Sequence, residues 1–96
     1  MRIILTASAA AELADAANWY ASRAPALTAR FLDQFEALIE RLADNPQQFP
    51  IVNGQTRRAG FLGFPYGLFF RLRDDQVEVF ACFHASRDPK RWQART

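Results

Sequence analysis

The chain is short of the residues that build disulfides, metal centres and phosphate-binding loops. Its 96 residues include one cysteine, one histidine and four glycines. A single cysteine cannot form an internal disulfide, and one cysteine with one histidine falls short of the four ligands of a structural zinc site. There is also no glycine-rich phosphate loop and no pair of cysteines, so we expect no metal site and no bound cofactor.

Long hydrophobic runs are absent as well. The apolar start is only Ile3 to Leu5, and Glu12 and Asp15 follow soon after it, which favours a strand leading into a helix over a signal peptide. No run approaches the roughly 20 apolar residues that span a bilayer. Cys82, in a predicted strand, is most simply a small buried residue in a reducing compartment. We therefore expect a cytoplasmic protein without membrane contact.

Lysine is nearly absent, and the basic residues that remain are unevenly distributed. Residues 1–50 carry four arginines against six acids, a balance of −2. Residues 51–96 carry seven arginines and Lys90 against four acids, a balance of +4. This is compatible with a solvated face, or with a partner that carries negative groups, either protein or nucleic acid, because a guanidinium pairs well with carboxylate and phosphate.

The first half of the chain predicts two helices. Thr6 or Ser8 caps a helix that runs to about Arg23 along an alanine-rich stripe. Pro25 ends this helix and opens a second one at its first turn, and Asn45 with the proline after it stops the second. The stripe of the second helix has helical spacing: Leu27, Phe31, Phe35, Leu38 and Leu42. Two helices joined by a tight turn predict an antiparallel hairpin.

The rest of the chain alternates between apolar and polar residues. Strands are predicted at residues 2–5, 56–62, 66–73 and 77–84, with a turn at Asp74-Asp75. The element order is β-α-α-β-β-β in a single domain, residues 1–96. This indicates an α+β fold, an antiparallel sheet packed on one face by the N-terminal helical hairpin.

Alternation also predicts which side chains share the open face of the sheet. Apolar residues from Tyr66 to Leu72 should face the helices, which turns Arg71 and Arg73 to the open face. The same parity places Val77, Val79, Ala81 and Phe83 toward the core, and Glu78 and His84 on the open face. His84 and Arg71, with Arg57 or Arg58, would then form one constellation able to stabilise a phosphorane-like transition state. The alternatives are a hydrogen-bonded structural His84 and surface arginines paired with the acids of the turn.

The residues near the end of the chain are first interpreted as structural. Asp88 can accept backbone N–H groups, Pro89 suits the first turn of a short helix, and Trp92 is expected to fold back over the open end of the core together with Phe83. Trp19 lies off the apolar stripe of the first helix, at a boundary position or exposed to a partner.

Together with the element order, the ending FPYGLFFRLRDDQVEVFACFHASRDPKRW resembles the toxins of the RelE/ParE superfamily of bacterial type II toxin–antitoxin systems. The most specific part is an aromatic strand ending in Arg71, an acidic turn, an apolar strand and then His84-x-x-Arg87-Asp88-Pro89-x-x-Trp92. The resemblance implies the RelE/ParE toxin fold and a cytoplasmic toxin neutralised by a cognate antitoxin, whose C-terminal segment wraps the toxin. It also implies that operator DNA is bound only through the antitoxin.

The resemblance leaves the target open between two branches. RelE-like toxins are ribosome-dependent mRNA endoribonucleases, and Arg57, Arg58, Arg71, His84 and Arg87 would supply such a site. However, the chain lacks the lysines, the late tyrosine and the general-base acid of that branch, with no acid between Asp44 and Asp74. ParE-like toxins inhibit DNA gyrase without chemistry on RNA, and the ending resembles this branch more, so we favour a gyrase inhibitor over an enzyme. A third alternative is a relic that binds antitoxin but is no longer toxic. The partner-binding candidates are Arg57, Arg58, Arg71, Arg73, His84, Arg87 and Trp19.

Overall fold

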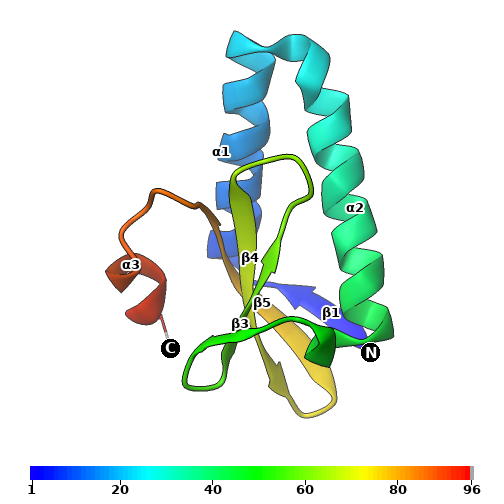
Figure 1. The fold of residues 1–96 in the computed structure, drawn as a ribbon, viewed down its shortest axis with the longest axis vertical. Helices are drawn as coiled ribbons and strands as arrows, with labels where there is room; N and C mark the ends of the chain where they lie inside the picture. Colours follow the sequence, from blue (N-terminus) through cyan, green and yellow to red (C-terminus); the bar gives the residue numbers. More distant parts are fainter. Residues whose placement is uncertain (96) are drawn as a thin grey trace.

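Along the chain, one strand is followed by two long helices and then by four more strands, and all five strands form one sheet (Figure 1). The computed structural model of the chain describes residues 1–95. The elements in chain order are β1 (Arg2–Leu5), α1 (Ala7–Arg23), η1 (Pro25–Leu27), α2 (Thr28–Asp44), η2 (Pro46–Gln48), β2 (Ile51–Asn53), β3 (Thr56–Gly60), β4 (Tyr66–Arg73), β5 (Gln76–His84) and α3 (Lys90–Gln93). Within residues 1–95, no helix is both long and apolar enough to cross a membrane.

The helical hairpin forms as the sequence predicts. Thr6 caps α1, because its Oγ1 accepts the backbone N–H of Ala9 at 3.1 Å. The chain reverses at Pro25, which begins a separate 3₁₀ turn rather than the first turn of α2 itself. Helix α2 ends at Asp44, immediately before the predicted stop signal. Both predicted stripes face inward, with Ala9, Ala16, Tyr20, Phe31, Leu38 and Leu42 buried.

The sheet has the order β1-β5-β4-β3-β2 and is antiparallel except at one edge. There β1 pairs with β5 in parallel, which the predicted all-antiparallel sheet did not include. The sequence also missed β2, because its residues are all exposed and a three-residue edge strand shows no alternation. The β4–β5 turn is as predicted: Asp74 and Asp75 both have positive φ, 51° and 62°, as a two-residue hairpin turn requires. The α+β fold with its helical hairpin is therefore confirmed, with these two changes.

A β-bulge in β5 overturns the predicted sorting of its side chains. Phe69 pairs with Ala81, but the next residue, Phe70, pairs with Val79, so Phe80 is an extra residue in β5. An extra residue exchanges the two faces of the strand beyond it. Val77 and Val79 face the helices as expected. After the bulge, Cys82 and His84 turn toward the helices, whereas Ala81 and Phe83 turn away.

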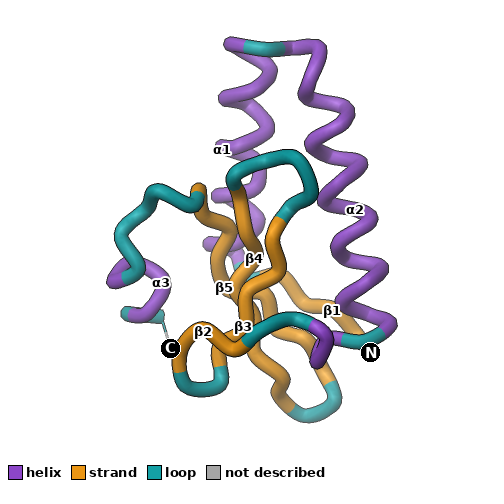
Figure 2. Tube along the Cα trace, in the orientation of Figure 1, coloured by secondary structure: helices purple, strands orange, loops and turns teal. Residues whose placement is uncertain are grey.

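The chain consequently has two apolar clusters, one on each face of the sheet. The main core lies between the sheet and the helical hairpin. The second cluster lies on the opposite face, where Trp92 of α3 stacks on Phe69 with ring centroids 4.6 Å apart. Its members are Phe69, Phe80, Ala81, Phe83 and Trp92. Figure 2 shows the loop after β5 bringing α3 back beside the strands. Trp92 and Phe83 thus build a second cluster and do not close the main core, which corrects the sequence prediction.

Candidate functional site

Arg71 and Arg73 lie at the turn end of the β4–β5 hairpin. The Nε of Arg71 donates to Oε1 of Glu78, its cross-strand neighbour, at 2.7 Å, and its guanidinium lies over the ring of Phe80. Arg73 is exposed beside the acidic turn. The alternative of a surface charge pair therefore describes Arg71.

Arg57 faces the opposite side of the sheet from Arg58. Its Nη1 donates to the backbone carbonyl oxygens of Phe49 at 2.6 Å and Gln47 at 3.2 Å. These bonds fix the irregular segment before β2 against β3, which gives Arg57 a structural task.

His84 does not share a face with Arg71, contrary to the prediction. It pairs with Tyr66 in register, and the two rings meet edge to face at 5.2 Å. Tyr66 and Arg71 are five positions apart on β4, roughly 17 Å at about 3.4 Å per residue. The imidazole Nδ1 accepts the backbone N–H of Ser86 at 3.0 Å and lies 2.8 Å from its hydroxyl. These contacts match the structural alternative for this histidine.

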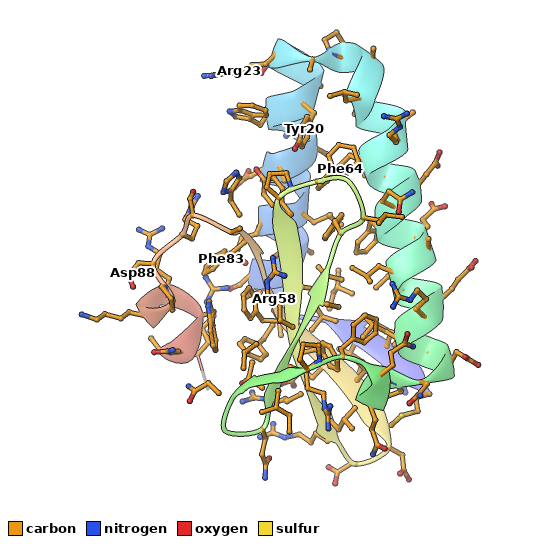
Figure 3. All side chains as sticks on the ribbon, viewed as in Figure 1. Tyr20, Arg23, Arg58, Phe64, Phe83 and Asp88 are labelled. Atoms are coloured by element: carbon orange, nitrogen blue, oxygen red, sulfur yellow. The ribbon has the colours of Figure 1, made fainter. Side chains whose placement is uncertain are left out.

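Two of the remaining candidates, Arg58 and Arg87, line one groove between the sheet and α3. We call this hollow of about 330 Å³ the arginine groove. Its lining residues are Val52, Arg58, Phe69, Phe83, His84, Ala85, Arg87, Pro89 and Trp92. None of them is acidic, and within residues 1–95 neither Arg58 nor Arg87 has an ion pair or a side-chain hydrogen bond. Figure 3 shows Arg58 and Phe83 between the strands and α3.

Arg58 is held in place by its surroundings. Gly60 and Gly67 are cross-strand partners, and the Arg58 guanidinium lies directly on them. A Cβ added at Gly67 would come within 2.6 Å of the Arg58 Nε and 2.8 Å of Nη2. The guanidinium carbon also lies 6.0 Å from the centre of the Phe69 ring. The sheet therefore presents a positioned cation that lacks a counterion within the described residues.

Sequence reasoning missed the contact that ties the C-terminal segment to α1. Arg95 donates to both carboxylate oxygens of Glu12, at 2.7 and 2.9 Å, and to the backbone oxygen of Phe80 at 3.0 Å. Glu12 also accepts the backbone N–H of Cys82 at 3.1 Å. The sequence did hold a signal for this contact. Glu12 lies three residues after Ala9 and four before Ala16, so its carboxylate is on the same inward-facing side of the helix as these buried alanines.

A second hollow, of about 190 Å³, lies between α1 and the end of β5. It is lined by Asp15 and Trp19 from α1 and by Tyr66, His84 and Arg87 from the sheet side. Trp19 is 47% exposed, and Arg23 lies over its ring at 5.1 Å. The prediction that Trp19 is accessible to a partner is compatible with this exposure.

The site holds few groups suited to proton transfer. Burial, with a smaller effect of the Glu12 charge, raises the pKa of the Cys82 thiol to about 12, so this thiol stays protonated near neutral pH. Residues 1–95 contain no cluster of three metal-binding side chains. What the arginine groove offers is fixed positive charge beside apolar surface, which is suited to binding an anionic group.

Comparison with known structures gives the class of the fold. The structure described as "Chromosomal ParDE TA system from P. aeruginosa" matches with a TM-score of 0.76 at 17% identity, over 88% of this chain and 95% of that one. The architecture is thus that of a chain in a toxin–antitoxin system. The sequence model of the family described as "ParE toxin of type II toxin-antitoxin system, parDE" matches residues 3–89. The chain belongs to this ParE toxin family. No curated protein sequence matched it.

Proposed function

We propose that this chain is a cytoplasmic toxin that inhibits DNA gyrase and is neutralised by a cognate antitoxin. The observation that carries the proposal is the match of the ParE toxin family over residues 3–89. Membership of a family of type II toxin–antitoxin systems implies an antitoxin partner. We propose that the antitoxin's C-terminal segment lies on this chain and that operator DNA is bound only through the antitoxin.

The placement of the candidate residues supports binding over RNA cleavage. A ribonuclease site needs an acid–base group within hydrogen-bond reach of the groups that stabilise charge. Here Arg71 is paired with Glu78, Arg57 holds backbone carbonyls, and His84 lies on the other face from Arg71. The mRNA endonuclease alternative consequently has less support than gyrase inhibition.

The test is supercoiling of relaxed plasmid by purified gyrase, with and without the folded toxin. Inhibition with trapped cleaved DNA, reversed by the antitoxin encoded beside the toxin, is the expected result. The same toxin preparation is also assayed for ribosome-dependent cleavage of mRNA, which tests the RelE-like alternative. Cleavage of mRNA without any effect on gyrase would overturn the proposal in favour of the RelE-like alternative. Antitoxin binding with neither activity would indicate the inactive relic.

Replacing His84 with alanine tests whether this residue contributes to binding or to chemistry. If gyrase inhibition depends on binding alone, His84→Ala should act only through affinity, and inhibition at saturating toxin should equal that of the unsubstituted chain. A loss of inhibition by His84→Ala that saturating toxin does not restore would contradict a binding role.

A further inference from the structure

The hairpin turn between β2 and β3 carries an Asn-Gly pair. The chain has three asparagines, and of these only Asn53 is followed by glycine. Asn45 precedes Pro46, which has no N–H, and Asn18 lies inside α1, where the following N–H belongs to the helix ladder. Asparagine is a thermolabile residue, and a following glycine favours its reaction because no Cβ crowds the glycine nitrogen.

The structure leaves both reacting groups of this pair accessible. Asn53, Gly54 and Gln55 are all exposed. Gly54 has a φ of 55°, and a Cβ built on it would meet no heavy atom within 4 Å apart from its chain neighbours. In the part of the chain that the structure describes, the side-chain amide of Asn53 and the backbone N–H of Gly54 have no hydrogen-bond partner. The Gly54 nitrogen can therefore reach the amide carbon without first breaking another contact.

Strand β2 restrains this turn only weakly. The reaction requires the main chain of Asn53 to rotate out of the extended conformation of the strand. Strand β2 is three residues long, lies at the edge of the sheet, and has an irregular register with β3 between Ile51 and Asn53. All of its residues are exposed, so opening the strand uncovers no core. Such a segment opens locally at a low free-energy cost, without unfolding of the rest of the chain.

A carboxylate at position 53 would lie beside Arg71 on the open face of the sheet. Asn53 pairs with Thr56, and Thr56 comes just before the Arg57–Phe70 pair, which places Thr56 next to Arg71 of β4. Asn53, Thr56 and Arg71 line one hollow of about 290 Å³. Asn53 and Arg71 are two strand spacings apart, about 10 Å between their backbones, so their side chains can meet above Thr56.

We propose that Asn53 is a site of spontaneous deamidation, which gives the β2–β3 turn a negative charge beside Arg71 as the protein ages. The Gly54 nitrogen forms a bond to Cγ of Asn53, the Cγ–N bond of the amide breaks, and the leaving amide takes the Gly54 proton to become ammonia. Water then opens the resulting succinimide at either carbonyl, which leaves an aspartyl or an isoaspartyl residue at position 53. The balance of residues 51–96 changes from +4 to +3, because a neutral amide becomes a carboxylate.

The test is incubation of the folded full chain at physiological pH and temperature, followed by tryptic digestion and mass spectrometry. Trypsin cleaves after Arg41 and Arg57, so Asn45 and Asn53 lie in one peptide and their fragment ions can be compared directly. We expect Asn53 to gain the mass difference between a hydroxyl and an amino group at least about tenfold faster than Asn45, because Pro46 has no N–H to close the ring. An isoaspartyl methyltransferase should label the same peptide. An unincubated sample corrects for conversion during digestion.

Two variants test the chemistry and the local opening. Asn53→Gln keeps the side-chain amide and the turn glycine but has to close a larger ring, so conversion at this position should slow at least about tenfold. Glu12→Ala removes the contacts at the opposite edge of the sheet and lowers the stability of the whole chain. Because the opening at β2 is local, Glu12→Ala should change the conversion rate of Asn53 by less than about twofold.

The charge beside Arg71 is tested with a variant that reproduces the aspartyl product. In Asn53→Asp, the NMR signal of the Arg71 side chain should shift relative to the unsubstituted chain, because a carboxylate now shares its hollow. Arg30, an exposed arginine on α2, is the matched control, and its signal should not move.

Three results would overturn the proposal. They are conversion of Asn53 no faster than that of Asn45, acceleration of the Asn53 reaction by Glu12→Ala beyond the stated limit, and an Arg71 signal that Asn53→Asp leaves unchanged. None of these measurements involves gyrase or an antitoxin. Failure of the deamidation proposal is therefore distinguishable from failure of the proposed function.

Discussion

Replacing Glu12 with alanine should destabilise the chain more than its partly exposed position suggests, because this carboxylate completes the edge of the sheet. Strand β1 pairs with β5 only from Gln76 to Val79, so within residues 1–95 the outer edge of β5 has no strand neighbour beyond that point. There the Glu12 carboxylate accepts the N–H of Cys82, and Arg95 donates to the carbonyl of Phe80. The two side chains replace the missing strand.

The magnitude follows from these contacts. Cys82 is only 2% exposed, and a buried N–H left without an acceptor costs about 1–3 kcal/mol. The ion pair with Arg95 is partly solvated, with side chains 20% and 31% exposed, and contributes at most about 1 kcal/mol. We expect Glu12→Ala to lower the free energy of unfolding by about 2–3 kcal/mol, or the melting temperature by about 10–20 °C for a domain of this size.

Urea unfolding followed by circular dichroism measures this loss. Glu12→Gln keeps an oxygen for the Cys82 N–H and loses only the charge, so it should cost about 1 kcal/mol or less. Asp15→Ala removes an exposed acid from the same helix and should change stability by less than about 0.5 kcal/mol. The reasoning is refuted if Glu12→Ala costs no more than Asp15→Ala, or if glutamine is as damaging as alanine.

Two further predictions concern stability. The pKa of the Cys82 thiol is raised from 9.0 to about 12, so the unfolded chain releases this proton first as the pH rises. The stability present below pH 9 should therefore fall between pH 9 and 12, by on the order of 1 kcal/mol at pH 10. Cys82→Ala should remove this loss, which urea unfolding at about pH 8 and about pH 10 measures. An unchanged pH dependence in that variant would rule out the thiol as its source. Asp75 has a φ of 62°, so Asp75→Gly should relieve backbone strain and raise stability by about 0.5–1 kcal/mol in thermal unfolding, whereas a lower melting temperature would contradict this.

The helices were predictable because their signals are local. The Thr6 cap, the apolar stripe around Phe31 and the stop before Pro46 each depend on neighbours within a few residues along the chain. The Asp74-Asp75 turn was predictable for the same reason, since aspartate tolerates positive φ. The family signature at the end of the chain was also readable from the sequence, and the family match is in agreement with it.

The candidate site was only partly predictable, because strand alternation was extended through a bulge. The extra residue Phe80 reverses the faces of the residues that follow it, which separates His84 from Arg71 and turns Phe83 outward. Nothing in the run VEVFACFH marks which residue is the extra one, since apolar residues occupy both faces there.

The sequence by itself determined the helical hairpin, the hairpin turn, the basic second half and the family. The tertiary structure alone decided which arginines line one groove, because strand pairing depends on register between strands that are distant in sequence. It brought Gly67 under Arg58, carried Arg95 back to Glu12 across 83 residues, and placed Trp92 on the second face of the sheet. A local sequence pattern specifies the secondary structure of the residues that carry it. A site depends on which residues of another strand or helix are placed beside them.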